Sequence, residues 1–275
     1  MLLGRIRSLL GLLAGADVDF FADQNSNPHP GAHALTYNRH GTYSPRVPSR
    51  KLGTRTSNST IIVGIGRGDI NSHTPPTDNM GNVFVQLDTA HPYIPRWPRS
   101  GTALYAARNV KGRRDYVATA TNASNPIDEV TLAVVQVVAG DLLDAKWNFV
   151  PSGSPLTSLS VTITAPATLV AFWWGDGDGT YRHTAVPNNG FHVIDSLLLE
   201  GNIVQCAVAV RNVNAPGTYD VTWTATVRQG AQLWLVALQK AQRTSTPIPG
   251  VPTSRAGTVP TTPSPCCRVR LRLPT

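Results

Sequence analysis

The residues best suited to chemistry in this chain lie in one acidic, glycine-rich loop. Residues 175–179 are Gly-Asp-Gly-Asp-Gly, so Asp176 and Asp178 alternate with glycines that permit a tight turn. Two carboxylates at this spacing can converge on one hard cation, and His183 offers an imidazole ligand nearby. The same residues also fit an ordinary Asp-Gly turn between strands. Two interpretations stay open, a plain turn or a metal site that prefers Ca²⁺ to Zn²⁺.

A related loop occurs earlier in the chain. Gly68-Asp69 follows an apolar run and His73 follows the pair, as in the later loop, but the second Gly-Asp is missing. We therefore expect Asp69 and His73 to be the weaker metal ligands.

Catalytic signatures are scarce. A Gly-x-Ser-x-Gly elbow and a His-Glu-x-x-His helix are both missing from the sequence. An enzyme would have to use Asp176, Asp178 and His183 as catalytic residues, with a metal that polarises a carbonyl and activates water. This predicts, as one alternative, a metal-dependent hydrolase of small esters or lactones.

Aromatic residues near polar loops suggest a different activity. Trp97 stands between prolines in a long loop that also holds His91 and Tyr93, and Trp173 and Trp174 are neighbours at a strand end. Neighbouring strand residues point to opposite faces, so we expect one ring in the core and Trp174 outside, near the acidic loop. An exposed ring covers the apolar face of a pyranose, which predicts a glycan- or small-molecule-binding surface. Alternatively, the rings cap the ends of the fold.

The elements that must position these residues occur in two similar sets. The run 59–66 resembles 167–174, and each precedes a Gly-Asp loop; 130–136 resembles 233–239. The offset between the pairs stays between 103 and 108 residues, which indicates an internal repeat.

Short β-branched runs separated by Gly, Pro, Asn and Asp clusters predict strands throughout the repeat. In the first half the expected strands are 59–66, 82–88, 102–110, 115–122 and 129–138. In the second half they are 158–164, 167–174, 191–199, 203–213, 218–227 and 231–239. The fold class we expect is all-β, with two duplicated β-sandwich units of the Ig-like or jelly-roll-like kind.

The expected domain organisation has four parts. Residues 1–54 form a signal-like or irregular leader and linker, 55–140 the first sandwich and 155–242 the second. Residues 243–275, rich in Pro, Thr and Arg, form a disordered tail. The basic start and short apolar run of the leader leave secretion or cell-surface display open against a cytoplasmic or phage-associated location. No run approaches the ~20 apolar residues of a transmembrane segment.

The formal net charge of +8 belongs to the flanks, because residues 55–240 hold 13 basic and 13 acidic side chains. The folded body therefore gives no reason to expect a specific nucleic-acid partner. The basic flanks predict at most weak contact with anionic surfaces.

One motif resembles a known family. Residues 78–82 read Asp-Asn-Met-Gly-Asn between two expected strands, and 103–106 read Ala-Leu-Tyr-Ala. This is similar to uncharacterised exported or prophage-associated bacterial β-sandwich proteins with a Thr-Asp-Asn-x-Gly-Asn turn. The resemblance covers roughly residues 55–240 and implies the fold, without catalytic residues to carry over.

The function we expect is a non-catalytic module that binds a glycan or a surface ligand, secreted or prophage-associated and suited to adhesion. The candidate ligand-binding residues are Trp97, Trp174, Tyr93 and His91. The hydrolase is one alternative, and a structural subunit of a phage or surface assembly is another.

Overall fold

The computed structural model describes residues 26–93, 97–176, 182–226 and 229–240. The strands of the first half are β1 (His29–Asn38), β2 (Arg46–Pro48), β3 (Ser59–Arg67), β4 (Thr77–Asp78), β5 (Val85–Tyr93), β6 (Trp97–Arg108), β7 (Ala118–Thr121) and β8 (Val130–Val138), with a short 3₁₀ helix, η2 (Ile70–Ser72). Those of the second half are β9 (Gly140–Val150), β10 (Leu156–Thr157), β11 (Val161–Ile163), β12 (Ala167–Asp176), β13 (Thr184–Pro187), β14 (His192–Leu197), β15 (Val204–Val213), β16 (Gly217–Tyr219), β17 (Thr222–Thr226) and β18 (Ala231–Lys240). Among the described residues, no helix has the length and apolarity needed to cross a membrane.

The fold is all-β, as the sequence predicts, and the two halves have the same strand order. In the first half a five-stranded antiparallel sheet runs β1-β8-β3-β6-β5 and a smaller sheet runs β2-β7-β4. In the second half the sheets run β9-β18-β12-β15-β14 and β10-β17-β13. The extra pair β11-β16 has a counterpart in the first half, the isolated bridge between Leu52 and Tyr116. This agreement is what an internal duplication predicts.

The strands of each half can be counted from one to eight if the extra pair β11 and β16 is left out. In this count the large sheet of each half has the order 1-8-3-6-5 and the small sheet has the order 2-7-4. The alternation 1-8-3-6 opposite 2-7-4 is closer to the strand order of a jelly roll than to that of an Ig-like sandwich. The fifth strand departs from it by pairing with the sixth at the edge of the large sheet. Residues 130–136 and 233–239 lie in β8 and β18, which occupy equivalent places, as the repeat predicts.

Two segments differ from the sequence prediction. Residues 23–54 were expected to be irregular, but β1 and β2 lie there, and β9 fills the gap expected between the sandwiches. Both β1 and β9 are edge strands, hydrogen-bonded on one side only, and much of each strand is half-exposed. Edge strands tolerate the His, Pro, Asp and Lys residues found in them, which hides their β pattern. The strands of the halves therefore begin at His29 and Gly140.

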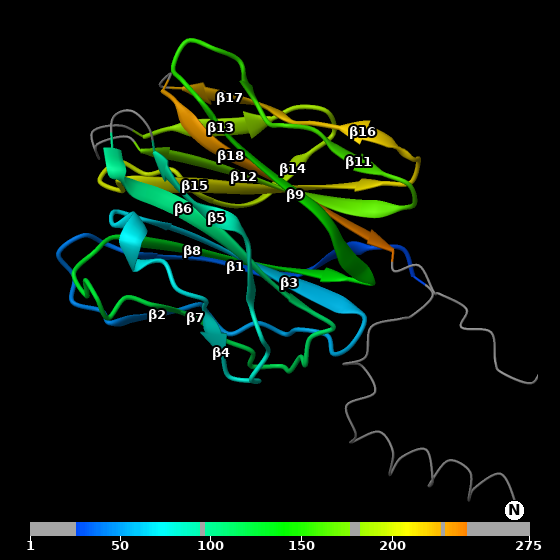
Figure 1. Cartoon of the computed structure of the whole chain (residues 1–275), viewed down its shortest axis with the longest axis horizontal. Helices are drawn as coiled ribbons and strands as arrows, with labels where there is room; N and C mark the ends of the chain where they lie inside the picture. Colours follow the sequence, from blue (N-terminus) through cyan, green and yellow to red (C-terminus); the bar gives the residue numbers. More distant parts are fainter. Residues whose placement is uncertain (1–25, 94–96, 177–181, 227–228, 241–275) are drawn as a thin grey trace, which may run out of the picture. The chain divides into compact units, whose positions relative to one another are not determined.

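The two large sheets pack face to face at the centre of the described fold, and a small sheet covers the outer face of each (Figure 1). At the edges of this central contact, β1 lies against β14 and β5 lies against β9. β1 and β9 are the first strands of the two halves, and β5 and β14 are the fifth strands. The first strand of each half therefore lies against the fifth strand of the other half. This is the pattern of an isologous, approximately two-fold interface, here formed within one chain.

The central contact is not symmetric in its side chains. The repeat aligns Gly64 with Phe172 and Gly66 with Trp174. A Cβ atom added at Gly66 would lie 2.6 Å from Trp174 Nε1, so the bare backbone of β3 is what makes room for the indole. Trp174 is only 1% exposed, and its ring stacks on Phe172 with the centroids 5.2 Å apart.

The expectation that Trp174 lies outside the core is therefore wrong. Trp173 and Trp174 do point to opposite faces of β12, but each face is covered. Trp173 enters the core between the large and small sheets of the second half, and Trp174 enters the contact with the first half. The prediction failed because it assumed that each sandwich has a free outer face.

The turn that carries the family resemblance has a structural role. Asp78 Oδ1 accepts hydrogen bonds from the backbone N–H groups of Met80 (2.9 Å) and Asn82 (3.0 Å), and Gly81 adopts a φ of +70°. Asn79 Oδ1 accepts from the N–H of Val117 at 3.0 Å, which ties the turn to the segment before β7. Such side-chain hydrogen bonds satisfy backbone N–H groups that have no partner strand where the chain leaves a sheet.

We predict that Gly66→Ala destabilises the fold by about 1–3 kcal/mol, because the new methyl group overpacks the central contact. Combining it with Trp174→Phe should cost less than the sum of the two single changes, since the smaller ring makes room. Urea denaturation measures all three. Gly53→Ala is the matched control, because no atom lies within 4 Å of the new methyl group there. Strictly additive costs would show that Gly66 and Trp174 are not coupled.

Candidate functional site

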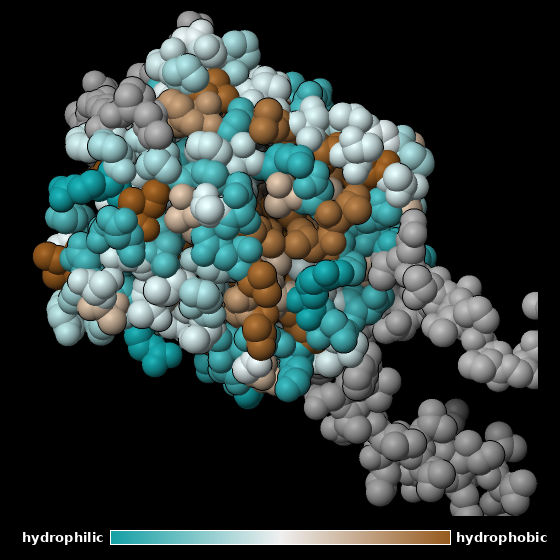
Figure 2. Space-filling view, in the orientation of Figure 1, coloured by the Kyte–Doolittle hydropathy of each residue, from teal (hydrophilic) through white to brown (hydrophobic). Residues whose placement is uncertain are grey.

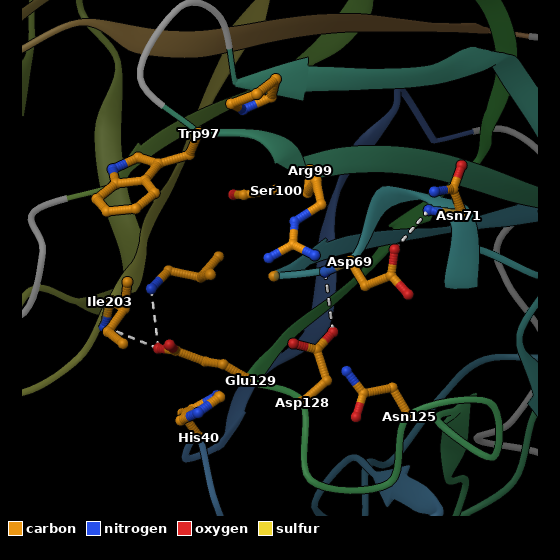
Figure 3. Close-up of a pocket in the computed structure, with 13 residues that line it drawn as sticks. His40, Asp69, Asn71, Trp97, Arg99, Ser100, Asn125, Asp128, Glu129 and Ile203 are labelled. Atoms are coloured by element: carbon orange, nitrogen blue, oxygen red, sulfur yellow. Dashed lines mark hydrogen bonds between the residues drawn. The ribbon is translucent and has the colours of Figure 1, made fainter.

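A cleft of about 640 Å³ opens where the two halves meet. It is built from the loop after β3, the start of β6, the residues before β8 and the start of β15 (Figure 3). Its lining residues are His40, Gly68, Asp69, Asn71, Trp97, Pro98, Arg99, Ser100, Asn125, Asp128, Glu129, Ile203 and Val204. We call this the junction cleft.

Glu129 joins the two halves at the base of the junction cleft. Its Oε1 accepts hydrogen bonds from the backbone N–H groups of Ile203 (2.7 Å) and Val204 (2.8 Å), at the start of β15. The hydroxyl of Tyr37, on β1, donates to the same oxygen. Glu129 is only 2% exposed, and burial raises the pKa of its carboxyl group above the usual range.

A second buried carboxylate, Asp128, holds the loop after β3. Its Oδ2 accepts a hydrogen bond from the backbone N–H of Asp69 at 3.1 Å, and burial raises the pKa of Asp128. The fully buried Arg67 lies close enough for its charge to oppose that rise. Its guanidinium donates to the carbonyl oxygens of Ser72 (2.7 Å) and Thr121 (3.1 Å), so it links the loops that carry Asp69 and Asp128.

Asp69 is also occupied by its own loop. Its carboxylate caps η2, accepting from the N–H of Asn71 at 3.2 Å and from the hydroxyl of Ser72 at 2.8 Å. Such a cap supplies acceptors to N–H groups that the short helix leaves unpaired.

The walls of the junction cleft carry an aromatic ring and a cation. Trp97 is 38% exposed, and Arg99 is exposed two residues further along β6. Figure 3 shows the Arg99 guanidinium directed into the cleft, towards Asp128 and Glu129. Arg99 makes no hydrogen bond or ion pair in the part of the chain that the structure describes. The cleft therefore combines an apolar ring with a cation that has no ion-pair partner among the described residues.

Of the four predicted ligand-binding residues, Trp97 alone lines the junction cleft. Tyr93 is only 6% exposed and its hydroxyl donates to the carbonyl of Gly230. His91 stacks on Trp147 with the centroids 3.7 Å apart, and its Nε2 lies 3.0 Å from Asp88 Oδ2. The expectation of exposed rings therefore fails for Tyr93 as well as Trp174, because β5 packs its end against the second half.

The predicted metal site stays a prediction. Asp178 and the side chain of Asp176 lie outside the described residues, and His183 is buried with its ring 6.1 Å from the Trp173 ring. In the earlier loop Asp69 caps η2, and His73 Nε2 lies 3.3 Å from the carbonyl oxygen of Gly101.

Burial and the Arg67 charge lower the pKa of His73 to about 3, so the ring is neutral at neutral pH. The described residues contain no cluster of three metal-ligating side chains.

Sequence reasoning missed Glu129 and Arg99 as site residues, although the repeat holds a signal for the first. An offset of 103 places Gln232, in β18, at the position of Glu129, directly before β8. Gln232 also joins the halves: its Oε1 accepts from the Thr102 hydroxyl and its Nε2 donates to the His91 carbonyl at 3.1 Å. A polar residue at both equivalent positions, before runs that are largely apolar, was the available clue.

No family model matches the chain, and neither a curated protein nor a solved structure does. The resemblance to exported or prophage-associated β-sandwich proteins therefore stays a prediction. The geometry of the junction cleft carries the functional argument.

We predict that Glu129→Gln weakens the pH dependence of stability. The folded state raises the pKa of Glu129, so its contribution is fully present below the unfolded pKa and is lost as the pH rises through the folded value. Gln retains an acceptor for Ile203 and Val204 without a charge to bury. The variant should be no less stable at pH 7, and should gain less than the wild type on acidification to about pH 5.

Chemical denaturation at several pH values measures this effect, with the exposed Glu200→Gln as the control. Both Asp128, whose pKa is also raised, and His73, whose pKa is lowered, remain in each protein and cancel in the comparison. Identical pH profiles for wild type and Glu129→Gln would contradict the assignment.

Proposed function

We propose that this protein is a non-catalytic carbohydrate-binding module that takes a glycan in the junction cleft. The observation that carries the proposal is the exposed ring of Trp97 beside polar side chains in a cleft of about 640 Å³. A flat aromatic surface covers the apolar face of a pyranose, and Asn71 and Asn125 offer amides to its hydroxyl groups. The volume falls in the range of small-molecule sites.

Binding fits the cleft better than hydrolysis does. Glycoside hydrolysis uses two carboxyl groups that face the scissile bond, one of them free to donate a proton. Here Glu129 accepts three hydrogen bonds on one oxygen, and Asp69 is held by its helix cap. Asp128 in turn holds the backbone N–H of Asp69. All three carboxylates of the cleft thus serve its architecture, which favours a binding role. Adhesion to a glycan-bearing surface after export is part of this proposal.

A structural subunit of a phage or surface assembly is the second candidate. It is favoured by the jelly-roll strand order, which capsid and lectin domains share. The metal-dependent hydrolase using Asp176, Asp178 and His183 remains an alternative, and a Ca²⁺ ion there remains a proposal. Chelator-sensitive ester or lactone turnover by the purified chain would establish it and overturn the binding module.

We predict that Trp97→Ala weakens glycan binding at least about tenfold, because a buried aromatic contact at a binding site is commonly worth 2 kcal/mol or more. A glycan array identifies a ligand, and calorimetry then gives the affinity. Tyr43→Ala is the matched control, because Tyr43 is 72% exposed and does not line the cleft. Equal affinities for wild type and Trp97→Ala, with unchanged melting temperatures, would move the binding site elsewhere.

A further inference from the structure

The charged groups of the junction cleft are not equally available to a ligand. Five charged or titratable side chains line it: His40, Asp69, Arg99, Asp128 and Glu129. The three carboxylates each accept hydrogen bonds from the protein, from backbone N–H groups in every case. Each of them therefore has at least one oxygen engaged by an internal donor, which limits what it offers a ligand.

Burial and neighbouring cations also act on two of these carboxylates, Asp128 and Glu129. Burial raises the pKa of both Asp128 and Glu129, and the buried Arg67 lies behind Asp128. His40 lies close enough to Glu129 for its charge to oppose that rise. The floor of the cleft therefore holds cationic as well as anionic side chains.

Arg99 differs from all of them. It is exposed, is directed into the cleft (Figure 3), and has no hydrogen-bond or ion-pair partner in the described part of the chain. A guanidinium offers a planar fork of donors that matches the two oxygens of a carboxylate or a sulfate. Arg99 follows Trp97 by two residues in β6, and both residues line the junction cleft.

We propose that the ligand of the junction cleft is an acidic glycan, one whose pyranose ring lies on Trp97 while its carboxylate or sulfate group binds Arg99. This inference rests on the proposed carbohydrate-binding function and names the class of sugar. A uronic acid has the required form, since its carboxylate extends from the edge of a ring whose face is apolar. Sulfated pyranoses share that chemistry.

The apolar surroundings of the cleft strengthen this pairing. Pro98, Ile203 and Val204 line the cleft beside Trp97, and Figure 2 shows apolar side chains scattered among hydrophilic ones on one face of the molecule. A charge-assisted hydrogen bond is stronger where apolar groups limit the access of water. A neutral sugar would leave the Arg99 guanidinium without an anionic partner.

The test uses the full-length chain and calorimetry with three trisaccharides. The first is a galacturonic acid trimer, the second is the same trimer with its carboxylates methyl-esterified, and the third is a sulfated galactose trimer. Arg99→Gln removes the charge and keeps an amide donor on a shorter side chain. Arg46→Gln is the matched control, because Arg46 is exposed on β2 and does not line the cleft.

We expect the galacturonate trimer to bind about tenfold more tightly than its methyl ester. The reason is that only the free carboxylate can form a charge-assisted hydrogen bond with Arg99. Arg99→Gln should remove that difference, and Arg46→Gln should preserve it. The sulfated trimer shows which anion the site prefers. Equal binding of the acid and its ester, abolished in both by Trp97→Ala, would overturn this inference and leave the carbohydrate-binding function standing.

An acid preference that survives Arg99→Gln would also overturn the inference, because the attraction would then come from elsewhere, such as the basic flanks. If no glycan binds on a broad array, both this inference and the proposed function fail. Tight binding of an oligonucleotide that Arg99→Gln weakens would likewise overturn it, since the anion would be a phosphate backbone.

Discussion

The structure depends on the burial of two large sheets against each other. The central strands β3, β8 and β18 are buried along nearly their whole length, so each is apolar on both faces. A single sandwich of this composition would leave one face of its large sheet in water, at a cost of about 25 cal/mol per Å² of apolar surface. Each half therefore needs the other, and a single residue, Ala139, separates β8 from β9.

The same contact creates the site. Two polar residues at equivalent places in the strand order, Glu129 before β8 and Gln232 in β18, each link one half to the other. Around Gln232 the space is filled by His91, stacked on Trp147, whereas around Glu129 it remains open as the junction cleft. The surroundings of Glu129 and Gln232 thus differ between the two halves, and the candidate binding site lies beside Glu129. The two halves also differ at Gly66 and Trp174 in the central contact. The second half supplies the Trp174 ring, and Gly66 of the first half leaves the space that the ring fills.

Much of the fold follows from the sequence because the central strands are continuous apolar runs bounded by turn residues. Edge strands such as β1 escaped prediction because half-exposed positions accept polar residues. The burial of Trp174 was not predicted, because the local sequence of a strand does not reveal whether another sheet packs on its outer face. Its proline-flanked setting made Trp97 a candidate in the sequence, and it lines the junction cleft, whereas Glu129 and Arg99 become candidates only when segments far apart in the chain meet. The junction cleft lies around Asp69, in the counterpart of the acidic loop, whereas residues 177–181 of the acidic loop itself lie outside the described residues.

The central claim is that the junction cleft, through Trp97, is where this protein binds its ligand. The six tryptophans give six indole N–H probes for nuclear magnetic resonance, and Trp97 is the exposed one among those that the structure describes. Titration of the full chain with an acidic oligosaccharide should shift the Trp97 indole signal, assigned by its loss in a Trp97 variant. The signals of the buried Trp174 and Trp234 should stay in place. A ligand that shifts other indole signals while leaving Trp97 unmoved would contradict the account.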